Sequence, residues 1–219
     1  MSILSENQKK ILDFISKDKF ITEHFYLSGG TALAEFYLEH RFSEDLDFFS
    51  EEEFDPQAIS VFFQKIKNKA GIKSVKYEQS FNRNLFFLEM LDGDYIKTEF
   101  TYYPFPRIEN GKHLNTLKID SLIDIAVNKV FTIYQNPRSR DFIDLYFIFS
   151  ERKDWNLDIL IKNAKIKFDY HVDRIQLAGQ FMKAEVLKDY PRMIKKIEDK
   201  EWKQFFIAQA KMIGVEELI

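Results

Sequence analysis

The residues best suited to chemistry lie in two short segments, LSGGTAL at residues 27–33 and SEDLDFF at residues 43–49. The second segment alternates acidic and apolar residues as a strand does, so Asp45 and Asp47 share one face, roughly 6–7 Å apart. Two carboxylates this close repel each other unless a cation lies between them. Mg²⁺ prefers oxygen ligands and is commonly held by one or two carboxylates together with substrate phosphates. The pair therefore predicts a Mg²⁺ site.

The first segment has the composition of a phosphate-binding turn. Two adjacent glycines let the backbone approach a ligand closely, and free N–H groups at the start of the following helix can hold a phosphate oxygen. Alone, a Gly-Gly turn is most often only a turn, and Asp-x-Asp is most often a solvated strand face. In combination they predict that the triphosphate of an NTP lies between the acidic pair and a cradle formed by Ser28, Gly29, Gly30 and Thr31.

The spacing of the two segments resembles the signature of the nucleotidyltransferase superfamily, in which a small-residue turn precedes an Asp-h-Asp-h strand, where h is apolar. More narrowly, GGTAL at residues 29–33 and YLEHRFSEDLDFF at residues 37–49 resemble the AbiEii family of abortive-infection toxins. The resemblance continues at IKTEF (96–100), at Lys129 and at RDFIDLY (140–146). It covers about residues 25–150, and the last 70 residues resemble only a generic helical tail.

The resemblance implies a Mg²⁺-dependent nucleotidyltransferase whose metal ligands are Asp45 and Asp47. It also makes Arg41 and Ser43 diagnostic of the family. Arg41 is suited to pair with a phosphate, and Ser43 is suited to hydrogen-bond a phosphate or to cap the turn before the acidic pair. The alternative is that both are ordinary surface residues, as in most Arg-x-Ser segments.

A third carboxylate is expected from a later strand, residues 94–103, where Lys97, Glu99 and Thr101 share one face. If this strand lies beside the acidic pair, Glu99 completes a three-carboxylate cluster of the kind used in two-metal phosphoryl transfer, as ligand or as base. The alternatives are that Lys97 and Glu99 line a solvated face, or that Glu89 on the neighbouring strand takes the role.

Three further residues are assigned to the active site by the resemblance, namely Lys129, Asp141 and Asp144. Lys129 interrupts the apolar face of a predicted helix, so it either extends to solvent or meets negative charge such as a triphosphate. Asp141 and Asp144 share a face of the next helix because they are three residues apart. The alternatives are a helix cap for Asp141 and a salt bridge from Asp144 to Arg138, Arg140 or Lys129.

The predicted elements that position these residues are helices and strands before about residue 120, and helices only after it. Helices are predicted over residues 6–17, 31–40, 55–69, 121–135, 139–150, 157–167, 172–187 and 190–212. Strands are predicted over residues 45–49, 72–79, 84–91 and 94–103, and an apolar run at 25–27 leads into the glycine turn. We therefore expect an α/β fold, with a nucleotidyltransferase-like mixed-sheet lobe over residues 1–118 and an all-helical lobe over residues 119–219.

Composition excludes several classes of protein. The 219 residues include no cysteine, which excludes disulfides, thiolate metal sites and a cysteine nucleophile. Neither a P-loop nor a dinucleotide-binding glycine motif occurs. Neither a secretory signal nor an apolar stretch of membrane-spanning length is found, so a cytoplasmic protein is expected. The net charge of −3 argues against a general nucleic-acid coat, although the second half of the chain is net basic.

These features predict an enzyme that transfers a nucleotide from an NTP to an acceptor hydroxyl. The resemblance implies a toxin of a toxin–antitoxin system, with an antitoxin encoded nearby and the acceptor end of tRNA as a possible substrate. One alternative is a nucleotidyltransferase that modifies a small molecule or a protein. The other is a non-catalytic binding protein that keeps the fold; the complete acidic set argues against it.

Overall fold

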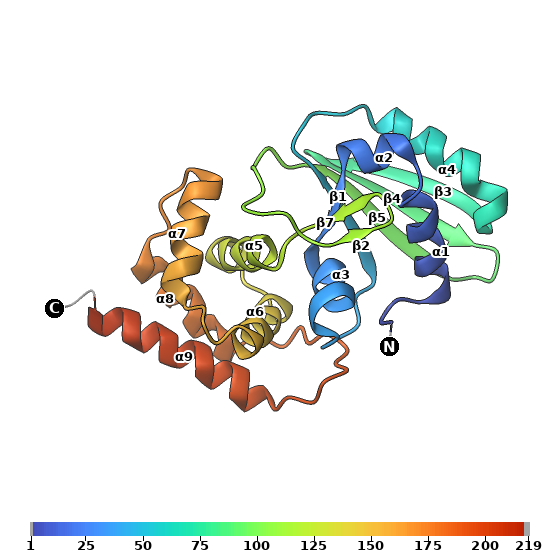
Figure 1. The fold of residues 1–219 in the computed structure, drawn as a ribbon. Coiled ribbons are helices and arrows are strands. Elements are labelled where there is room, and N and C mark those ends of the chain that lie inside the picture. Colours follow the sequence, from blue (N-terminus) through green and yellow to red (C-terminus); the bar gives the residue numbers. More distant parts are fainter. Residues whose placement is uncertain (1, 217–219) are drawn as a thin grey trace. The chain divides into compact units, whose positions relative to one another are not determined.

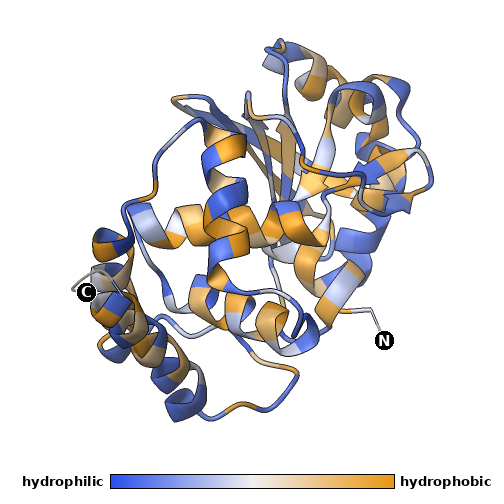
Figure 2. Cartoon of the chain, turned by 60° about the vertical axis from the view of Figure 1, so that its left-hand side comes forward, coloured by the Kyte–Doolittle hydropathy of each residue, from blue (hydrophilic) through white to orange (hydrophobic). Residues whose placement is uncertain are grey.

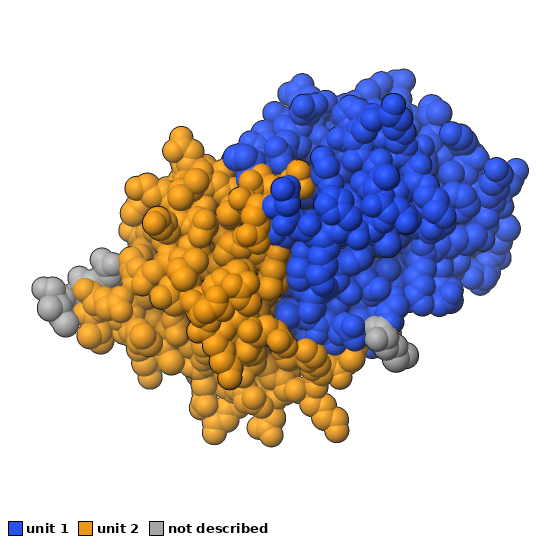
Figure 3. Space-filling model, in the orientation of Figure 1, with its two compact units in different colours: residues 1–106, 110–121 blue, residues 107–109, 122–219 orange. Residues whose placement is uncertain are grey.

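The computed structural model describes residues 2–216. Its contacts divide the chain into two compact units, residues 1–106 with 110–121 and residues 107–109 with 122–219 (Figure 3). The first unit combines a sheet with helices, and the second is built from helices (Figure 1). No helix in the described part of the chain is long and apolar enough to cross a membrane.

The first unit is organised around a seven-stranded sheet with the order β3-β4-β5-β2-β1-β7-β6. Its strands are β1 (Tyr26–Ser28), β2 (Asp45–Ser50), β3 (Ile72–Ser80), β4 (Arg83–Met90), β5 (Tyr95–Tyr102), β6 (His113–Leu114) and β7 (Leu117–Ile119). The pairs β2–β5 and β1–β7 are parallel, whereas the other neighbours are antiparallel. The predicted mixed α/β fold is therefore confirmed.

The two faces of this sheet differ because apolar and polar side chains alternate along β2 and β5. Leu46 and Phe48 of β2 are fully buried, and Phe48 stacks on Phe100 of β5. Phe63 of helix α4 (Pro56–Ala70) packs edge-on against Phe100, so α4 covers this apolar face. The opposite face carries the alternate residues of the same strands, which include the acidic pair.

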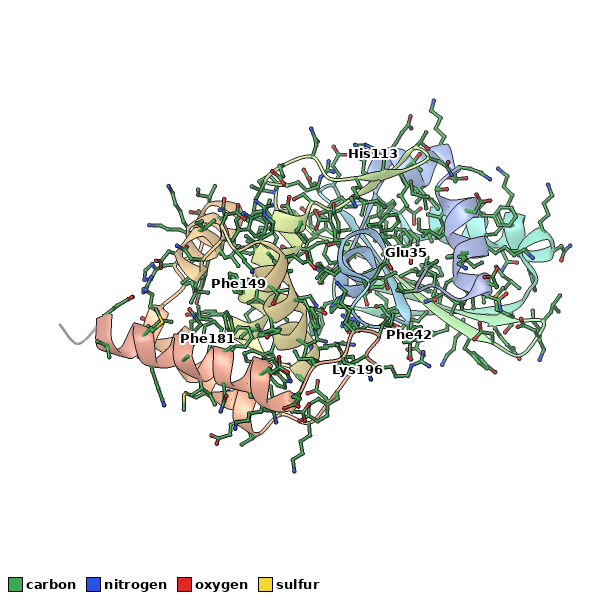
Figure 4. The ribbon with its side chains drawn as sticks, turned by 60° about the horizontal axis from the view of Figure 1, so that its bottom comes forward. Glu35, Phe42, His113, Phe149, Phe181 and Lys196 are labelled. Carbon is green, nitrogen blue, oxygen red and sulfur yellow. The ribbon has the colours of Figure 1, made fainter. Side chains whose placement is uncertain are left out.

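Four helices complete the first unit, namely α1 (Glu6–Ile15), α2 (Lys19–His24), α3 (Gly29–Leu33) and α4. The helix predicted over residues 31–40 is observed as α3 followed by a π-helical segment, Ala34–Leu38, which ends at Glu39 in the left-handed conformation (φ 47°). Glu35 of this segment accepts a hydrogen bond of 2.8 Å from the backbone N–H of Ile3 (Figure 4).

The second unit contains α5 (Leu122–Gln135), α6 (Ser139–Glu151), α7 (Leu157–Phe168), α8 (Arg174–Met182), a 3₁₀ turn (Lys183–Glu185) and α9 (Asp199–Glu216). These helices carry separate apolar and polar stripes, as Figure 2 shows. Phe142, Phe181, Trp202 and Phe206 form a buried aromatic core, in which the rings of Phe142 and Phe206 lie 4.8 Å apart (Phe181 is labelled in Figure 4).

Residues 107–109 belong to the helical unit, and they are attached to it through a buried ion pair. The ammonium of Lys167 lies 2.6 Å from the carboxylate of Asp124, and both side chains are inaccessible to solvent. Asp124 also accepts hydrogen bonds from the backbone N–H groups of Ile108 and Glu109. These bonds compensate the cost of burying the carboxylate.

Two predicted helices were wrong in part, and two short strands were not predicted. The helix predicted over 190–212 begins only at Asp199, and residues 191–198 are not helical. The helix predicted over 172–187 begins at Arg174 and ends at Met182, after which a 3₁₀ turn follows. Strands β6 and β7 were not predicted, since two or three residues are too few to show alternation.

Candidate active site

The acidic residues of β2 and β5 lie side by side on the sheet face opposite α4. The parallel register pairs Asp45 with Lys97 and Asp47 with Glu99. Residues paired in this way project to the same face, on strands that lie about 5 Å apart. The structure thus brings together the two carboxylates of β2 and the predicted third carboxylate.

The competing residue, Glu89 on β4, is placed elsewhere. It pairs in the register with Tyr95, the first residue of β5, whereas Asp45 and Asp47 pair with Lys97 and Glu99 further along that strand. Its carboxylate accepts hydrogen bonds from Lys73 (2.6 Å) and Ser74 (2.7 Å) on β3. Glu89 therefore belongs to an exposed pair near the edge of the sheet.

Two cations contact the carboxylates of β2 and β5. Arg83 donates two hydrogen bonds of 2.6 Å, one to each oxygen of Glu99. The ammonium of Lys97 lies 2.8 Å from Asp45 Oδ2 and 3.9 Å from Glu99 Oε2. The sequence pattern had placed Lys97 on this face without a role, and Arg83 was not singled out, because its position depends on the β4–β5 register.

The environment of Glu99 keeps it ionised. Burial alone would raise the pKa of Glu99, but the hydrogen bonds and charge of Arg83, the hydroxyl of Thr101 and the charge of Lys97 together lower this pKa below its ordinary value. A carboxylate with a lowered pKa is a weak base. The lowered pKa therefore argues against Glu99 as the proton acceptor.

The glycine turn lies directly against site side chains. Gly29 has a φ of 72°, and a Cβ at this position would come within 2.5 Å of Asp47 Oδ2. A Cβ on Gly30 would collide with the guanidinium of Arg41 and come within 3.2 Å of Ser43 Oγ. Each glycine thus leaves space for a predicted site residue, which only a residue without a side chain can do.

The remaining residues of the turn are tied to neighbouring strands. Thr31 Oγ1 donates to the backbone carbonyl of Asp45, which fixes α3 against β2. Ser28 Oγ donates a 2.6 Å hydrogen bond to Asp120 Oδ2, so the proton of this hydroxyl is directed to Asp120. Asp120 is fully buried at the end of β7, and its backbone N–H bonds Leu27 on β1.

Asp120 is a residue that sequence reasoning missed. It reaches Ser28 only because β7 pairs in parallel with β1, and these strands have too few residues for the pairing to be predicted. An acidic residue directly after an apolar run of a few residues was the one available signal.

The segment that carries Arg41 and Ser43 is held in place by α1. Arg41 is almost completely buried, and its Nη1 donates to the carbonyl of Phe42 at 2.9 Å. The side-chain amide of Gln8 donates to the carbonyls of Ser43 (3.1 Å) and Glu44 (2.9 Å). The same Gln8 completes the capping box of α1, so the start of that helix positions this segment.

The second unit contains a cluster formed by the other predicted residues. The ammonium of Lys129 lies 2.7 Å from Asp141 Oδ1 and 2.6 Å from Asp144 Oδ2, and all three side chains are buried. Arg138 Nε donates to the second oxygen of Asp141 at 2.9 Å. Burial would raise the pKa of Asp141, but the charges of Lys129 and Arg138 lower it overall. The salt bridge from Asp144 to Lys129, which was one of the structural alternatives, is therefore present.

The donor chemistry of the acidic face fits a hard divalent cation. Asp45, Asp47 and Glu99 offer only oxygen atoms, and the Gly29 cradle brings backbone close to Asp47. Within residues 2–216, however, no three acidic or histidine side chains converge as the ligands of one metal ion. The ammonium of Lys97 lies beside the carboxylates of both Asp45 and Glu99.

Comparison with known proteins identifies the family of the chain from its sequence. Residues 13–211 match the family described as "Nucleotidyl transferase AbiEii toxin, Type IV TA system". An uncharacterized protein of Aquifex aeolicus (strain VF5) is 38% identical over 154 residues, which is 68% of either chain.

Solved structures share the fold at low sequence identity. A structure titled as a putative nucleotidyltransferase from H. pylori has a TM-score of 0.60 and 19% identity, and the match covers 99% of both chains. MenT4, a nucleotidyltransferase toxin of Mycobacterium tuberculosis H37Rv, has a TM-score of 0.59 and 16% identity, over 87% of this chain and 75% of MenT4. The resemblance drawn from the residue motifs is thus confirmed, and the chain belongs to the AbiEii nucleotidyltransferase toxin family.

Proposed function

We propose that this nucleotidyltransferase toxin transfers a nucleotide from an Mg²⁺-bound NTP to a hydroxyl of tRNA, and that the acidic face of β2 and β5 is its catalytic centre. The observation that carries the proposal is the pairing of Asp47 with Glu99, beside Asp45 and against the glycine turn. This arrangement combines oxygen ligands for a cation with backbone that a triphosphate can approach.

Asp45, Asp47 and Glu99 would hold the metal ion, which when bound neutralises charge that develops on the phosphates. The acceptor oxygen forms a bond to the α-phosphorus, and the bond to the leaving pyrophosphate breaks in line with it. The proton of the acceptor hydroxyl passes to a carboxylate of this face or to water. Since the pKa of Glu99 is lowered, Glu99 contributes mainly as a ligand that fixes the geometry.

The phosphates are assigned to the turn at residues 28–31, with Arg41 and Ser43 beside it. Ser28 accepts rather than donates toward a ligand, because its proton is engaged by Asp120. Lys129, Asp141 and Asp144 are assigned to the same reaction by the family resemblance. In the structure the two carboxylates hold the Lys129 ammonium, so a phosphate would have to compete with both.

The acceptor is assigned from the charge of the chain, and the partner is assigned from the family. The second half of the chain is net basic, which suits an acceptor that carries phosphates. The family description places its members in type IV toxin–antitoxin systems, so we propose an antitoxin as the partner of this chain.

The test is transfer of label from each α-labelled NTP to total tRNA in the presence of Mg²⁺. The unsubstituted protein is compared with the double variant Asp45→Asn/Asp47→Asn. The control is Asp92→Asn/Asp94→Asn, which alters a second Asp-x-Asp pair in the exposed β4–β5 turn. Labelled tRNA that is lost only in the first variant is expected. Label on protein or on a small molecule instead of tRNA would contradict the assigned acceptor, and transfer that survives Asp45→Asn/Asp47→Asn would contradict the assigned centre.

A further inference from the structure

Lys97 occupies the space between two carboxylates of the candidate centre. Its ammonium lies 2.8 Å from Asp45 and 3.9 Å from Glu99, and its side chain is 26% exposed. Lys97 faces Asp45 directly in the β2–β5 register, so the strand pairing places the two side chains next to each other.

A metal ion that contacts both carboxylates must take the place of this ammonium. Mg²⁺ binds carboxylate oxygens at about 2.0–2.1 Å, which leaves no space for a second cation between Asp45 and Glu99. Two positive charges within a few ångströms of each other also repel strongly. Occupancy by Lys97 and occupancy by a metal ion therefore exclude each other.

Of Arg83 and Lys97, the lysine is the one that can leave. Arg83 donates to both oxygens of Glu99, and such paired hydrogen bonds hold a planar guanidinium in a fixed orientation. Oε1 of Glu99 also accepts from the hydroxyl of Thr101 at 3.0 Å, so Oε2 is the oxygen that keeps a lone pair for another ligand. Lys97 makes one short contact through a flexible four-carbon chain, and a part of that chain is already exposed.

We propose that Lys97 is an exchangeable internal counter-ion, which occupies the cation position between Asp45 and Glu99 until a metal-bound nucleotide displaces it. The inference rests on the proposed function, since it takes Asp45 and Glu99 as metal ligands. Without nucleotide, Lys97 competes with divalent cations and keeps their affinity low. A triphosphate gives the displaced ammonium a new partner, so metal and nucleotide bind together.

The test is the affinity of the nucleotide-free full-length protein for Mn²⁺, followed by the electron paramagnetic resonance signal of unbound Mn²⁺. Lys97→Met and Lys97→Gln remove the positive charge, and folding of each variant is checked by circular dichroism. We expect both to bind Mn²⁺ at least tenfold more tightly than the unsubstituted protein. Lys73→Met, which breaks the comparable pair with Glu89 on β3 and β4, should leave the affinity unchanged.

Two results separate the inference from the proposed function. The gain in Mn²⁺ affinity must disappear in Asp45→Asn/Lys97→Met; a gain that persists would overturn the inference, because the ion would then bind elsewhere. Equal affinity in the unsubstituted protein and both Lys97 variants would also overturn the inference. In that case the proposed centre still stands if transfer is lost in Asp45→Asn/Asp47→Asn, and it falls if transfer survives there.

Discussion

Asp47 on β2 and Glu99 on β5 are direct neighbours in a parallel register, although a helix and two further strands separate them in the sequence. Parallel pairing requires a crossover, and here α4, β3 and β4 form the connection. The acidic face is therefore assembled by the topology of the sheet, and it depends on the correct packing of the whole first unit.

Gly29→Ala tests the close approach of the turn to Asp47. The new Cβ would meet Asp47 Oδ2 at 2.5 Å in a backbone conformation with positive φ. We expect a loss of about 1–3 kcal/mol in the free energy of unfolding, measured by urea denaturation, together with loss of transfer. The control is Gly179→Ala in α8, where a Cβ meets nothing within 4 Å and helix propensity gives a gain of about 0.5–1 kcal/mol. Equal effects of the two substitutions would contradict the steric argument.

Asp120→Asn tests the buried bond to Ser28. The substitution removes the charged acceptor of a 2.6 Å hydrogen bond at a fully buried position. The free energy of unfolding, measured by urea denaturation, should therefore fall by about 1–3 kcal/mol. Transfer should fall as well, because a neutral amide oxygen holds the Ser28 hydroxyl less strongly than a carboxylate does. Asp154→Asn removes an exposed partner of Arg152 and should change stability by less than about 0.5 kcal/mol. Full stability and full transfer in Asp120→Asn would show that the bond has no positioning role.

Lys129→Met tests the cluster between α5 and α6. It leaves the carboxylates of Asp141 and Asp144 buried without their shared cation, and breaking a buried pair in this way costs about 3–5 kcal/mol. Thermal unfolding monitored by circular dichroism measures the loss. Lys9→Met, which breaks the exposed pair with Glu6, is the control and should cost less than about 1 kcal/mol. A similarly small effect of Lys129→Met would mean that the cluster does not hold the helices together.

The lowered pKa of Glu99 predicts a specific pH dependence of stability. In the folded state the group binds protons less readily than in the unfolded state, where its pKa is about 4.3. Its stabilising contribution is therefore complete above that value and is lost as the pH falls through the folded-state pKa.

Urea denaturation at several pH values between 7 and 3 checks this prediction. The stability difference between the unsubstituted protein and Glu99→Gln should be largest near neutral pH and shrink toward pH 3. Glu78→Gln on the edge strand β3 serves as the exposed control. A difference that stays constant with pH would argue against the ion network around Glu99.

Local patterns in the sequence were sufficient to predict the strand at Asp45–Ser50 and the common face of Lys97 and Glu99. They also predicted the helix over 55–69, which is observed as α4 with Asp55 as its N-cap. These signals act over a few residues, so they can be recognised in the sequence without knowledge of the tertiary structure.

The unpredicted features depend on contacts between distant segments. Arg83 reaches Glu99 through the register of β4 and β5, and Asp120 reaches Ser28 through the pairing of β7 with β1. The helix predicted over 190–212 is absent before Asp199, and Ile194 in this stretch is exposed, so it contributes no buried face that would hold a helix in place. Pairing of distant strands is set by the packed core, which no single short segment encodes.

The most direct test of the central claim compares Asp47→Asn, Glu99→Gln and Glu89→Gln in single-turnover transfer of labelled nucleotide. If the face of β2 and β5 is the catalytic centre, the first two variants should lose at least about 100-fold in rate while remaining folded. Glu89→Gln changes the same residue type on the neighbouring strand, within an exposed pair, and should stay within about twofold of the unsubstituted rate. Folded Asp47→Asn or Glu99→Gln protein with an unchanged rate would contradict the account.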